Sequence, residues 1–477
     1  MASSGSYAHP GIEGLQLGSA DVRIDFMELI AASGDATPLE RVFVSFNMYE
    51  NLFRDQVTAD IMINDSINLP YKLPILGEEY LNFEISCKSV KGEGPSLAPG
   101  NMYVTSISDR HQTKDRQQLY IIHLTSEQDM INSNTTVSQA FRGKKISEIV
   151  QTILEDYCFT DNDFVIEQTN GVENIVIPNW KPFKAINWLA KRALNTNDVP
   201  NYLFYESNGS TFFKSIDKLM QQEIKQEFVF GPVVDKNNVL YELTQGKTHI
   251  TDLKILHQFD TIRNTLNGYY ASKLITHDIV TKKIEQRTWG LNQSYDKRIA
   301  HTDDWMPISA TEPDYGSYMN DRHSFAPQEL GFNEGSNVQS YFDSRVMFYP
   351  KHNNMYAENS VYSSTDVYDN RVEDWKLQRN ALILGLDQVK LSIVFPGLSY
   401  LRVGALIHIV VPSTEKVREE NPGMVKNPDD LVDKFLSGNY LITALKHRVA
   451  WADGKLKYTM HAECVKDALH AVPTYRL

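Results

Sequence analysis

A repeat within the chain is the feature of this sequence that most constrains its fold. The segment Gly438–His470 aligns without a gap on the segment Gly100–Asn132. The identical positions include Gly100 and Gly438, Asn101 and Asn439, Thr105 and Thr443, Arg110 and Arg448, Tyr120 and Tyr458, His123 and His461, and Asp129 and Asp467. Apolar residues agree at Val104 and Ile442, Ile107 and Leu445, Ile122 and Met460, and Ile131 and Leu469. Since internal repeats define an architecture, we predict one β-hairpin module that is used once in each half of the chain.

Alternation of apolar and polar residues predicts antiparallel strands in both halves. In residues 19–130 the stretches DVRIDFMELI, RVFVSFNMYENLF, VTADIMIND and YLNFEISCKSV carry this period, with many β-branched and aromatic side chains. Strand patterns return in residues 226–290 and 367–470. There Gly404 is the expected counterpart of Gly77, because each precedes an apolar strand that leads into the repeated hairpin. Short strands joined by turns are typical of small antiparallel barrels or sandwiches, so we predict two similar antiparallel β-barrel domains.

An α/β insert is predicted between these two β regions, in residues 131–225. Apolar residues in KKISEIVQTILEDYC recur at helical spacing. A second helix is predicted in KPFKAINWLAKRALN, where Pro182 lies near the first turn. The stretch NYLFYESNGSTFFKSI predicts a hairpin with its turn at Asn208-Gly209, and a short helix around Lys218–Gln226 follows. A further helix is predicted from Arg371 to about Asp387.

The predicted fold class is α+β, with two β-barrel domains, the α/β insert and a long insertion in the second half. Residues 1–18 are small, polar and glycine-rich, which predicts a flexible N-terminal arm. The first barrel takes residues 19–130, and the second takes 226–290 and 367–470. Residues 291–366 hold many polar and aromatic residues but few apolar runs, which predicts an ordered, loop-rich insertion domain. Residues 415–437 are predicted to form a longer loop in place of Gly92–Gly100.

Composition limits the partners of the chain. It carries 47 Lys and Arg against 60 Asp and Glu, a net charge of −13. Because nonspecific DNA binding depends on neutralised phosphates, an acidic chain without a basic stripe is a poor sequence-independent DNA binder. No apolar run approaches the roughly 18 residues that span a bilayer. The three cysteines, Cys87, Cys158 and Cys464, are far apart and predict buried thiols rather than a disulfide framework.

The sequence offers no constellation that predicts an active site. It contains no HExxH, CxxC, GxSxG or GxxxxGK[ST] motif. His408, His447 and His461 lie on adjacent predicted strands, but histidines with structural hydrogen bonds are far more common than a metal trio. The segment Asp161-Asn162-Asp163 resembles the start of a calcium loop but lacks its later glycine and glutamate. We therefore predict no catalytic, cofactor-binding or metal-binding residues.

Three stretches, taken in order, carry a resemblance to a known family. The first is YIIHLTSEQDMIN followed by the FRGKKISEIVQTILEDY helix. The second is IVIPNWKPFKAINWLAKRAL followed by YLFYESNGSTFFKSIDKL. The third is the ending FPGLSYLRVGALIHIVVPS, SGNYLITALKHRV and KYTMHAECVKDAL. Covering most of residues 19–225 and 370–470, they make the chain similar to the central baseplate hub proteins of contractile-tailed bacteriophages, which are related in fold to the hub half of type VI secretion spike proteins.

The resemblance implies a structural protein rather than an enzyme. Its two barrels would be tail-tube-like, and three copies would form a ring with pseudo-sixfold symmetry. Such a homotrimer would join the ring of the hexameric tail tube to the trimeric central spike protein, with the tape measure protein and the baseplate wedge as further neighbours. It would lie in the tail baseplate of the virion, after assembly in the cytoplasm of the host bacterium, without contact to a membrane. DNA would pass through its lumen without sequence-specific binding, and a strongly basic lumen would contradict that role.

Two other functions remain open at this stage. One is hydrolysis of cell-wall polysaccharide, with a carboxylate pair such as Asp303 and Asp304 in the 291–366 insertion, since glycosidases use two acids roughly 5–10 Å apart. Acidic residues in a solvated loop are the simpler explanation of that pair. The other is a hub in a tailocin or a secretion device, which the residues alone barely distinguish from a phage hub.

Overall fold

The computed structural model describes the greater part of the chain. The described residues are 22–73, 75–89, 92–93, 96–114, 116–158, 163–231, 246–258, 260–279, 282–291, 302, 306–307, 342–351, 372–413, 432–433, 435–452 and 454–469. The predicted arm 1–18, most of the insertion 291–366 and most of the loop 415–437 lie outside them. Within the described ranges, no helix has both the length and the apolar character needed to cross a membrane.

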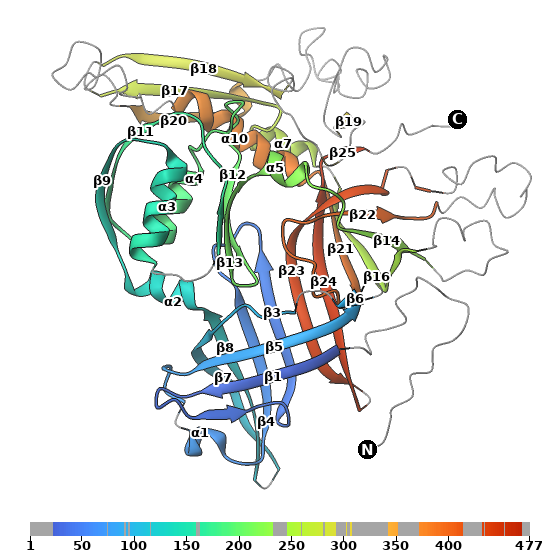
Figure 1. The fold of residues 1–477 in the computed structure, drawn as a ribbon. Helices are drawn as coiled ribbons and strands as arrows, with labels where there is room; N and C mark the ends of the chain where they lie inside the picture. The colour runs from blue at the N-terminus through green and yellow to red at the C-terminus, as the bar shows by residue number, and fades with distance from the viewer. Residues whose placement is uncertain are drawn as a thin grey trace, which may run out of the picture.

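Five strands form a first sheet unit (Figure 1), in the order β3-β4-β8-β7-β5. Each strand pairs antiparallel with the next. Their bounds are β3 Phe43–Asn51, β4 Thr58–Asp65, β5 Tyr80–Ser89, β7 Met102–Lys114 and β8 Gln117–Ser126. Shorter or flanking elements are β1 Val22–Ile30, β2 Ala36–Pro38, α1 Leu69–Lys72 and β6 Gly92–Glu93. Strand β1 continues the sheet beyond β5, also antiparallel.

A second sheet unit repeats this order as β16-β21-β24-β23-β22. Again each strand is antiparallel to the next. Their bounds are β16 Asp252–Gln258, β21 Val389–Pro396, β22 Leu406–Val410, β23 Gly438–Ala452 and β24 Lys455–Lys466. Beyond β22 lie β14 Gln226–Phe230 and β15 Thr248–Ile250. Here the copies differ, because β14 runs parallel to β22 whereas β1 runs antiparallel to β5.

The predicted hairpin repeat is confirmed. Strands β7–β8 and β23–β24 occupy the same place in the two units, and both contain a bulge at the shared threonine. Thr105 is skipped between β7 and β8, and Thr443 is skipped between β23 and β24. The preceding glycines also correspond: Gly77 and Gly404 have φ of 98° and 81°, a conformation that glycine adopts at little cost.

The equivalence ends sooner than the sequence predicts. In the first copy helix α2, Glu127–Asn134, begins directly after β8. In the second copy β24 continues to Lys466, and the short strand β25, Ala468–Leu469, follows. Asp129 and Asp467 are therefore identical in sequence but lie in different local structures.

The prediction of two similar closed barrels is not confirmed, and the described residues contain no closed barrel. The two units instead belong to one 15-stranded sheet. Strand β23 pairs with β3 from Ala444 opposite Asn51 to Ala450 opposite Ser45. An unpaired strand edge is a favourable docking place for another strand, and here each unit covers an edge of the other. One apolar core of buried side chains runs under both, from Met27 to Cys464.

The insert forms a separate core against one side of the sheet. Helix α3 spans Ile146–Tyr157, as predicted, and α4 spans Pro182–Ala190, ending earlier than predicted. The predicted hairpin is β12 Tyr202–Ser207 with β13 Ser210–Ser215, and its turn residues Asn208 and Gly209 have φ of 44° and 80°. Helix α5 is Ile216–Met220 rather than 218–226, because Gln226 already begins β14. The remaining strands are β9 Val137–Lys144, β10 Phe164–Ile166 and β11 Glu173–Trp180.

The rest of the described chain lies above the second unit in Figure 1. Helix α10, Val372–Leu386, matches the predicted helix, whereas α7, Thr261–Leu266, has no counterpart among the predictions. A three-stranded sheet has the order β18-β17-β20. These strands are β17 Ala271–Asp278, β18 Ile284–Gly290 and β20 Val346–Lys351. The remaining elements are strand β19, Met306–Pro307, which pairs with β25, and the 3-10 helix Phe342–Ser344.

Candidate functional site

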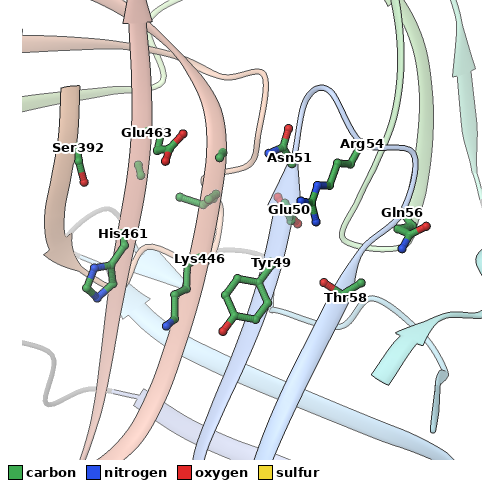
Figure 2. A pocket seen from close by; sticks show the side chains of 13 residues that line it. Tyr49, Glu50, Asn51, Arg54, Gln56, Thr58, Ser392, Lys446, His461 and Glu463 are labelled. Carbon is green, nitrogen blue, oxygen red and sulfur yellow. The ribbon is translucent and has the colours of Figure 1, made fainter. Parts of the chain in front are cut away.

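The seam where β23 pairs with β3 is the place where the two units meet, and it carries a surface pocket. The pocket encloses about 520 Å³ and is lined from β21, β24, β23, β3 and β4 (Figure 2). Alternation along each strand places apolar side chains on the core face and polar ones on the pocket face. Glu50 is the exception on β3, because it lines the pocket yet is almost fully buried.

A row of polar side chains crosses the pocket from strand to strand. Figure 2 shows His461 on β24, Lys446 on β23 and Tyr49 on β3 at one level. His461 is opposite Lys446, and Lys446 is opposite Tyr49. The Lys446 Nζ lies 5.3 Å from the centre of the Tyr49 ring, a cation–π distance. One level away, Lys390 Nζ lies 2.8 Å from Glu463 Oε2. Both contacts join neighbouring strands across the sheet.

Burial and neighbouring charges disfavour the protonated forms of His461 and Lys446. Burial lowers the pKa of His461, and the nearby Lys446 and Arg448 lower it further. Burial and the charge of Arg448 lower the pKa of Lys446. On the other side of the row, burial and the Asp60 carboxylate raise the pKa of Tyr49. His461 is therefore neutral at pH 7.

A second hydrogen-bond chain crosses the first unit and has the order of a Ser-His-Asp triad. Ser108 Oγ lies 2.8 Å from His123 Nε2, and His123 Nδ1 lies 2.6 Å from Asp60 Oδ1. Ser108 Oγ also lies 3.2 Å from Asp109 Oδ2, so its proton has a competing acceptor. None of these residues lines the pocket at the seam. A triad acts through an oxyanion site beside a bound substrate, and this chain lies on an open strand face, so we interpret it as a cross-strand network.

Two buried glutamates fasten the insert to the sheet. Glu50 accepts hydrogen bonds from Ser207 Oγ at 2.9 Å and from the backbone N–H groups of Asn208 and Val403. Burial raises its pKa, although the charge of Arg402 opposes that shift. Glu50 thereby ties β3 to the β12–β13 turn of the insert and to the start of β22.

Glu206 makes the matching contact from the insert side. It accepts hydrogen bonds from Ser126 Oγ at 2.6 Å and from the Val57 N–H at 3.2 Å. Burial raises the pKa of Glu206 to about 8, so the group is largely protonated at pH 7. Neither glutamate was predicted as a functional residue from the sequence. The sequence nevertheless contained a signal for them, because each is a glutamate at an inward-facing position of a strand whose other inward positions are mostly apolar.

The three candidate histidines do not come together. His447 is fully buried on the core face, where its Nδ1 lies 2.7 Å from the Tyr458 hydroxyl, and burial holds its pKa well below the usual value. His461 points into the pocket on the opposite face. His408 Nδ1 lies 2.8 Å from Asn439 Oδ1. Each histidine has its own environment on β22, β23 or β24.

The other residues considered from the sequence are two carboxylate-containing segments and the cysteines. Asp303, Asp304, Asp161 and Asn162 fall outside the described residues. In the ranges that are described, no group of three or more His, Cys, Asp or Glu side chains is placed to hold a metal ion. The three cysteines are buried, as predicted, and form no disulfide.

Comparison with known proteins finds similarity in structure but not in sequence. No protein-family model matches the chain, and no curated protein does. A tail protein from Neisseria meningitidis MC58 has a TM-score of 0.49 at 8% identity, covering 93% of this chain and 96% of its own. The 43 kDa tail protein of prophage MuSo2 from Shewanella oneidensis has a TM-score of 0.48 at 9% identity, covering 92% and 98%. The PdpA-VgrG complex has a TM-score of 0.45 at 8% identity, covering 97% and 68%. The solved structures to which this chain is similar include phage tail and baseplate proteins and type VI secretion spike-related proteins.

Proposed function

We propose that this chain is a structural hub of a contractile tail, and that three copies form a ring that joins a hexameric tail tube to a trimeric spike. The observation that carries the proposal is the duplicated sheet unit. Strands β3-β4-β8-β7-β5 and β16-β21-β24-β23-β22 have the same order and belong to one continuous sheet. The sequence resemblance to baseplate hub proteins supports the same role.

Duplication solves a problem of symmetry. A closed ring needs the same contact at every step, and a threefold ring cannot offer six equal sites to a sixfold tube unless each subunit supplies two. One chain with two similar units supplies them. The distinct surroundings of the units, with the insert beside one and β14 and β15 beside the other, leave a threefold pattern for the spike.

The proposal includes a domain division that follows the predicted one. The first sheet domain takes residues 19–130, the insert 131–225, the second sheet domain 226–290 and 367–470, and the insertion 291–366. DNA would pass the polar face of the sheet. That face carries charges of both signs near the seam, with Lys446 and Arg448 against Asp60 and Glu463. Mixed charge gives fewer phosphate contacts than a basic groove and therefore weak, salt-sensitive retention.

Measurement of the molar mass by light scattering tests the proposal. The purified chain, alone and with the spike protein of the same tail, is expected to have the mass of three copies. An interface that holds such a ring belongs to the large class, roughly 2,000–5,000 Å² or more, so the trimer should survive dilution. A chain that remains a monomer with the spike protein present would contradict the proposed function.

A further inference from the structure

The two copies of the hairpin differ in how much of their outer edge is covered. In the second unit, the edge of β23 away from β24 is covered twice, by β22 at residues 438–441 and by β3 at residues 444–450. In the first unit, β5 covers the matching edge of β7 only at Met102 and Tyr103. Among the described residues, β7 from Ser106 to Ser108 has a strand partner on one side only, which is β8.

A matching edge exists at the other end of the sheet. The counterpart of β3 in the second unit is β16, because each pairs with the strand beside the second hairpin strand. Strand β16 pairs with β21 and, in the part of the chain that is described, with no other strand. Its side chains Ile255 and Leu256 are 47% and 50% exposed. Open edges that carry apolar side chains invite pairing with another chain.

We propose that β7 of one molecule pairs antiparallel with β16 of a second copy, repeating between molecules the β23–β3 pairing that joins the two units within one molecule. This inference rests on the proposed ring, since it names the contact that would close it. The occupant is a second copy rather than an unrelated strand, because the chain itself contains both halves of the contact and shows how they fit.

The internal pairing also predicts the register. Arg448 is opposite Asn47, Asn47 is opposite Asp60, and Asp60 is opposite His123. These pairs form a row of four residues across β23, β3, β4 and β8.

The second unit contains the matching row. Asp252 is opposite Val394, and Val394 is opposite His461. His461 is the repeat counterpart of His123, so Asp252 takes the place of Asn47.

The place of Arg448 in the first unit follows from the hairpin pairs. Arg448 is opposite Thr459, the repeat counterpart of Ile121, and Ile121 is opposite Ser108. Arg110, the sequence counterpart of Arg448, lies where the β7–β8 register shifts, between Ser108 and His111. The repeat therefore sets Ser108 opposite Asp252 of the second copy and, two residues along, Ser106 opposite Lys254.

The contact is head-to-tail: each molecule offers one β7 edge and one β16 edge, so copies add in one direction until the ring closes. Main-chain hydrogen bonds of this kind give affinity, and side chains fix the register.

A cysteine pair tests the contact on the full chain. Directly opposite residues in an antiparallel pair have Cα atoms roughly 4.5–5.5 Å apart, within reach of a disulfide. The double variant Ser108→Cys with Asp252→Cys is therefore expected to give covalent dimers and trimers under mild oxidation, seen on a non-reducing gel. The native cysteines are buried and should not react.

The matched control is Arg448→Cys with Asp252→Cys. Arg448 is exposed and takes the place of Ser108 in the second unit, but it lies beside β3 of its own chain. It should give no cross-link to Asp252→Cys. Cross-linking in the control at the rate of the test pair would overturn the proposed contact.

Light scattering of the same variants separates this contact from the ring itself. A trimer by light scattering with no cross-link would overturn the β7–β16 contact while leaving the ring intact. A persistent monomer would instead overturn the proposed function.

Discussion

The two hairpins show how one backbone design can be built around different buried polar groups. Tyr120 and Tyr458 are both fully buried, yet the Tyr120 hydroxyl lies 3.3 Å from Asp65 Oδ2 while the Tyr458 hydroxyl contacts His447. The repeat thus conserves the ring and changes the partner of its hydroxyl. Apolar packing sets the shared frame, and hydrogen bonds adapt each copy to its place.

The ends of the hairpins differ in charge as well. Ser126, at the end of β8, donates to the buried carboxylate of Glu206. Lys466, at the end of β24, is fully buried and donates to the carbonyl groups of Ser437 and Phe435. The first hairpin is therefore tied to the insert, and the second to the loop that precedes its own strand. Four sets of substitutions test which structural roles the two copies share.

The largest effect is expected at Gly397, which has no glycine counterpart in the first unit. A Cβ atom there would lie 2.0 Å from the Tyr458 ring, whereas Ile63 occupies the place opposite Tyr120. We expect Gly397→Ala to lower the free energy of unfolding by about 3 kcal/mol, because a well-packed core resists added volume. Denaturant unfolding measures this loss. Adding Tyr458→Leu should recover part of it, and full additivity of the two changes would contradict the contact.

The next effect concerns Glu206 and its dependence on pH. Its pKa of about 8 in the folded state lies above the unfolded value of 4.5. Its stabilising contribution is thus complete below the unfolded pKa and is lost as pH rises toward 8. His447 acts in the opposite sense, since its lowered pKa costs stability only as pH falls below about 6.5. The window from about pH 6.5 to 8 therefore isolates the carboxylates.

In that window the unfolding free energy of the wild type should fall with pH, by at most about 1.4 kcal/mol per pH unit from one group. Glu206→Gln should flatten the slope, because the amide cannot ionise. Glu50, whose pKa is also raised, contributes to the slope that remains. Urea unfolding at several pH values measures the difference. An unchanged slope in Glu206→Gln would show that the end of the first hairpin is not where this proton is held.

Removal of the two tyrosine hydroxyls compares the copies directly. Tyr458→Phe should cost about 2 kcal/mol, because it leaves the buried His447 ring without its hydroxyl partner. Tyr120→Phe should cost about 1 kcal/mol or less, since Asp65 still accepts hydrogen bonds from the Ile67 and Leu69 N–H groups. Thermal or denaturant unfolding of the two variants ranks them. Equal losses would mean that the hydroxyl partners do not distinguish the copies.

Local patterns in the sequence were enough to predict the elements but not their assembly. Helices α3 and α10 and the β12–β13 hairpin follow from periodicity and turn residues, which act over a few positions. The pairing of β23 with β3 joins segments about four hundred residues apart, and no local pattern encodes such a contact. For that reason the sequence predicted two separate barrels, whereas the structure has one continuous sheet. Helix α2 was missed because the repeat alignment extended across it.

The candidate site was harder to predict for a related reason. Identical residues in a repeat suggest identical roles, but His123 contacts Asp60 while His461 lies beside Lys446. The neighbours come from β4 and β23, so the role of each histidine is set by the strand beside it. The strand patterns place Glu50 and Glu206 at inward positions, but their partners come from the insert packing against the sheet, which no local pattern encodes.

The smallest expected effect tests whether the shared bulge is built in the same way twice. Thr105 Oγ1 donates to the His123 carbonyl at 3.1 Å, and Thr443 Oγ1 donates to the Glu463 carbonyl at 3.1 Å. Thr443 is only 3% exposed, whereas Thr105 is exposed. Because water can replace a lost partner only at the exposed site, Thr443→Val should cost about 1 kcal/mol and Thr105→Val less than about 0.5 kcal/mol. Paired denaturation curves resolve this difference. A larger loss at Thr105 would mean that the bulge in β7 depends on its threonine more than the bulge in β23 does, and the open β7 edge would then be the less tolerant of the two.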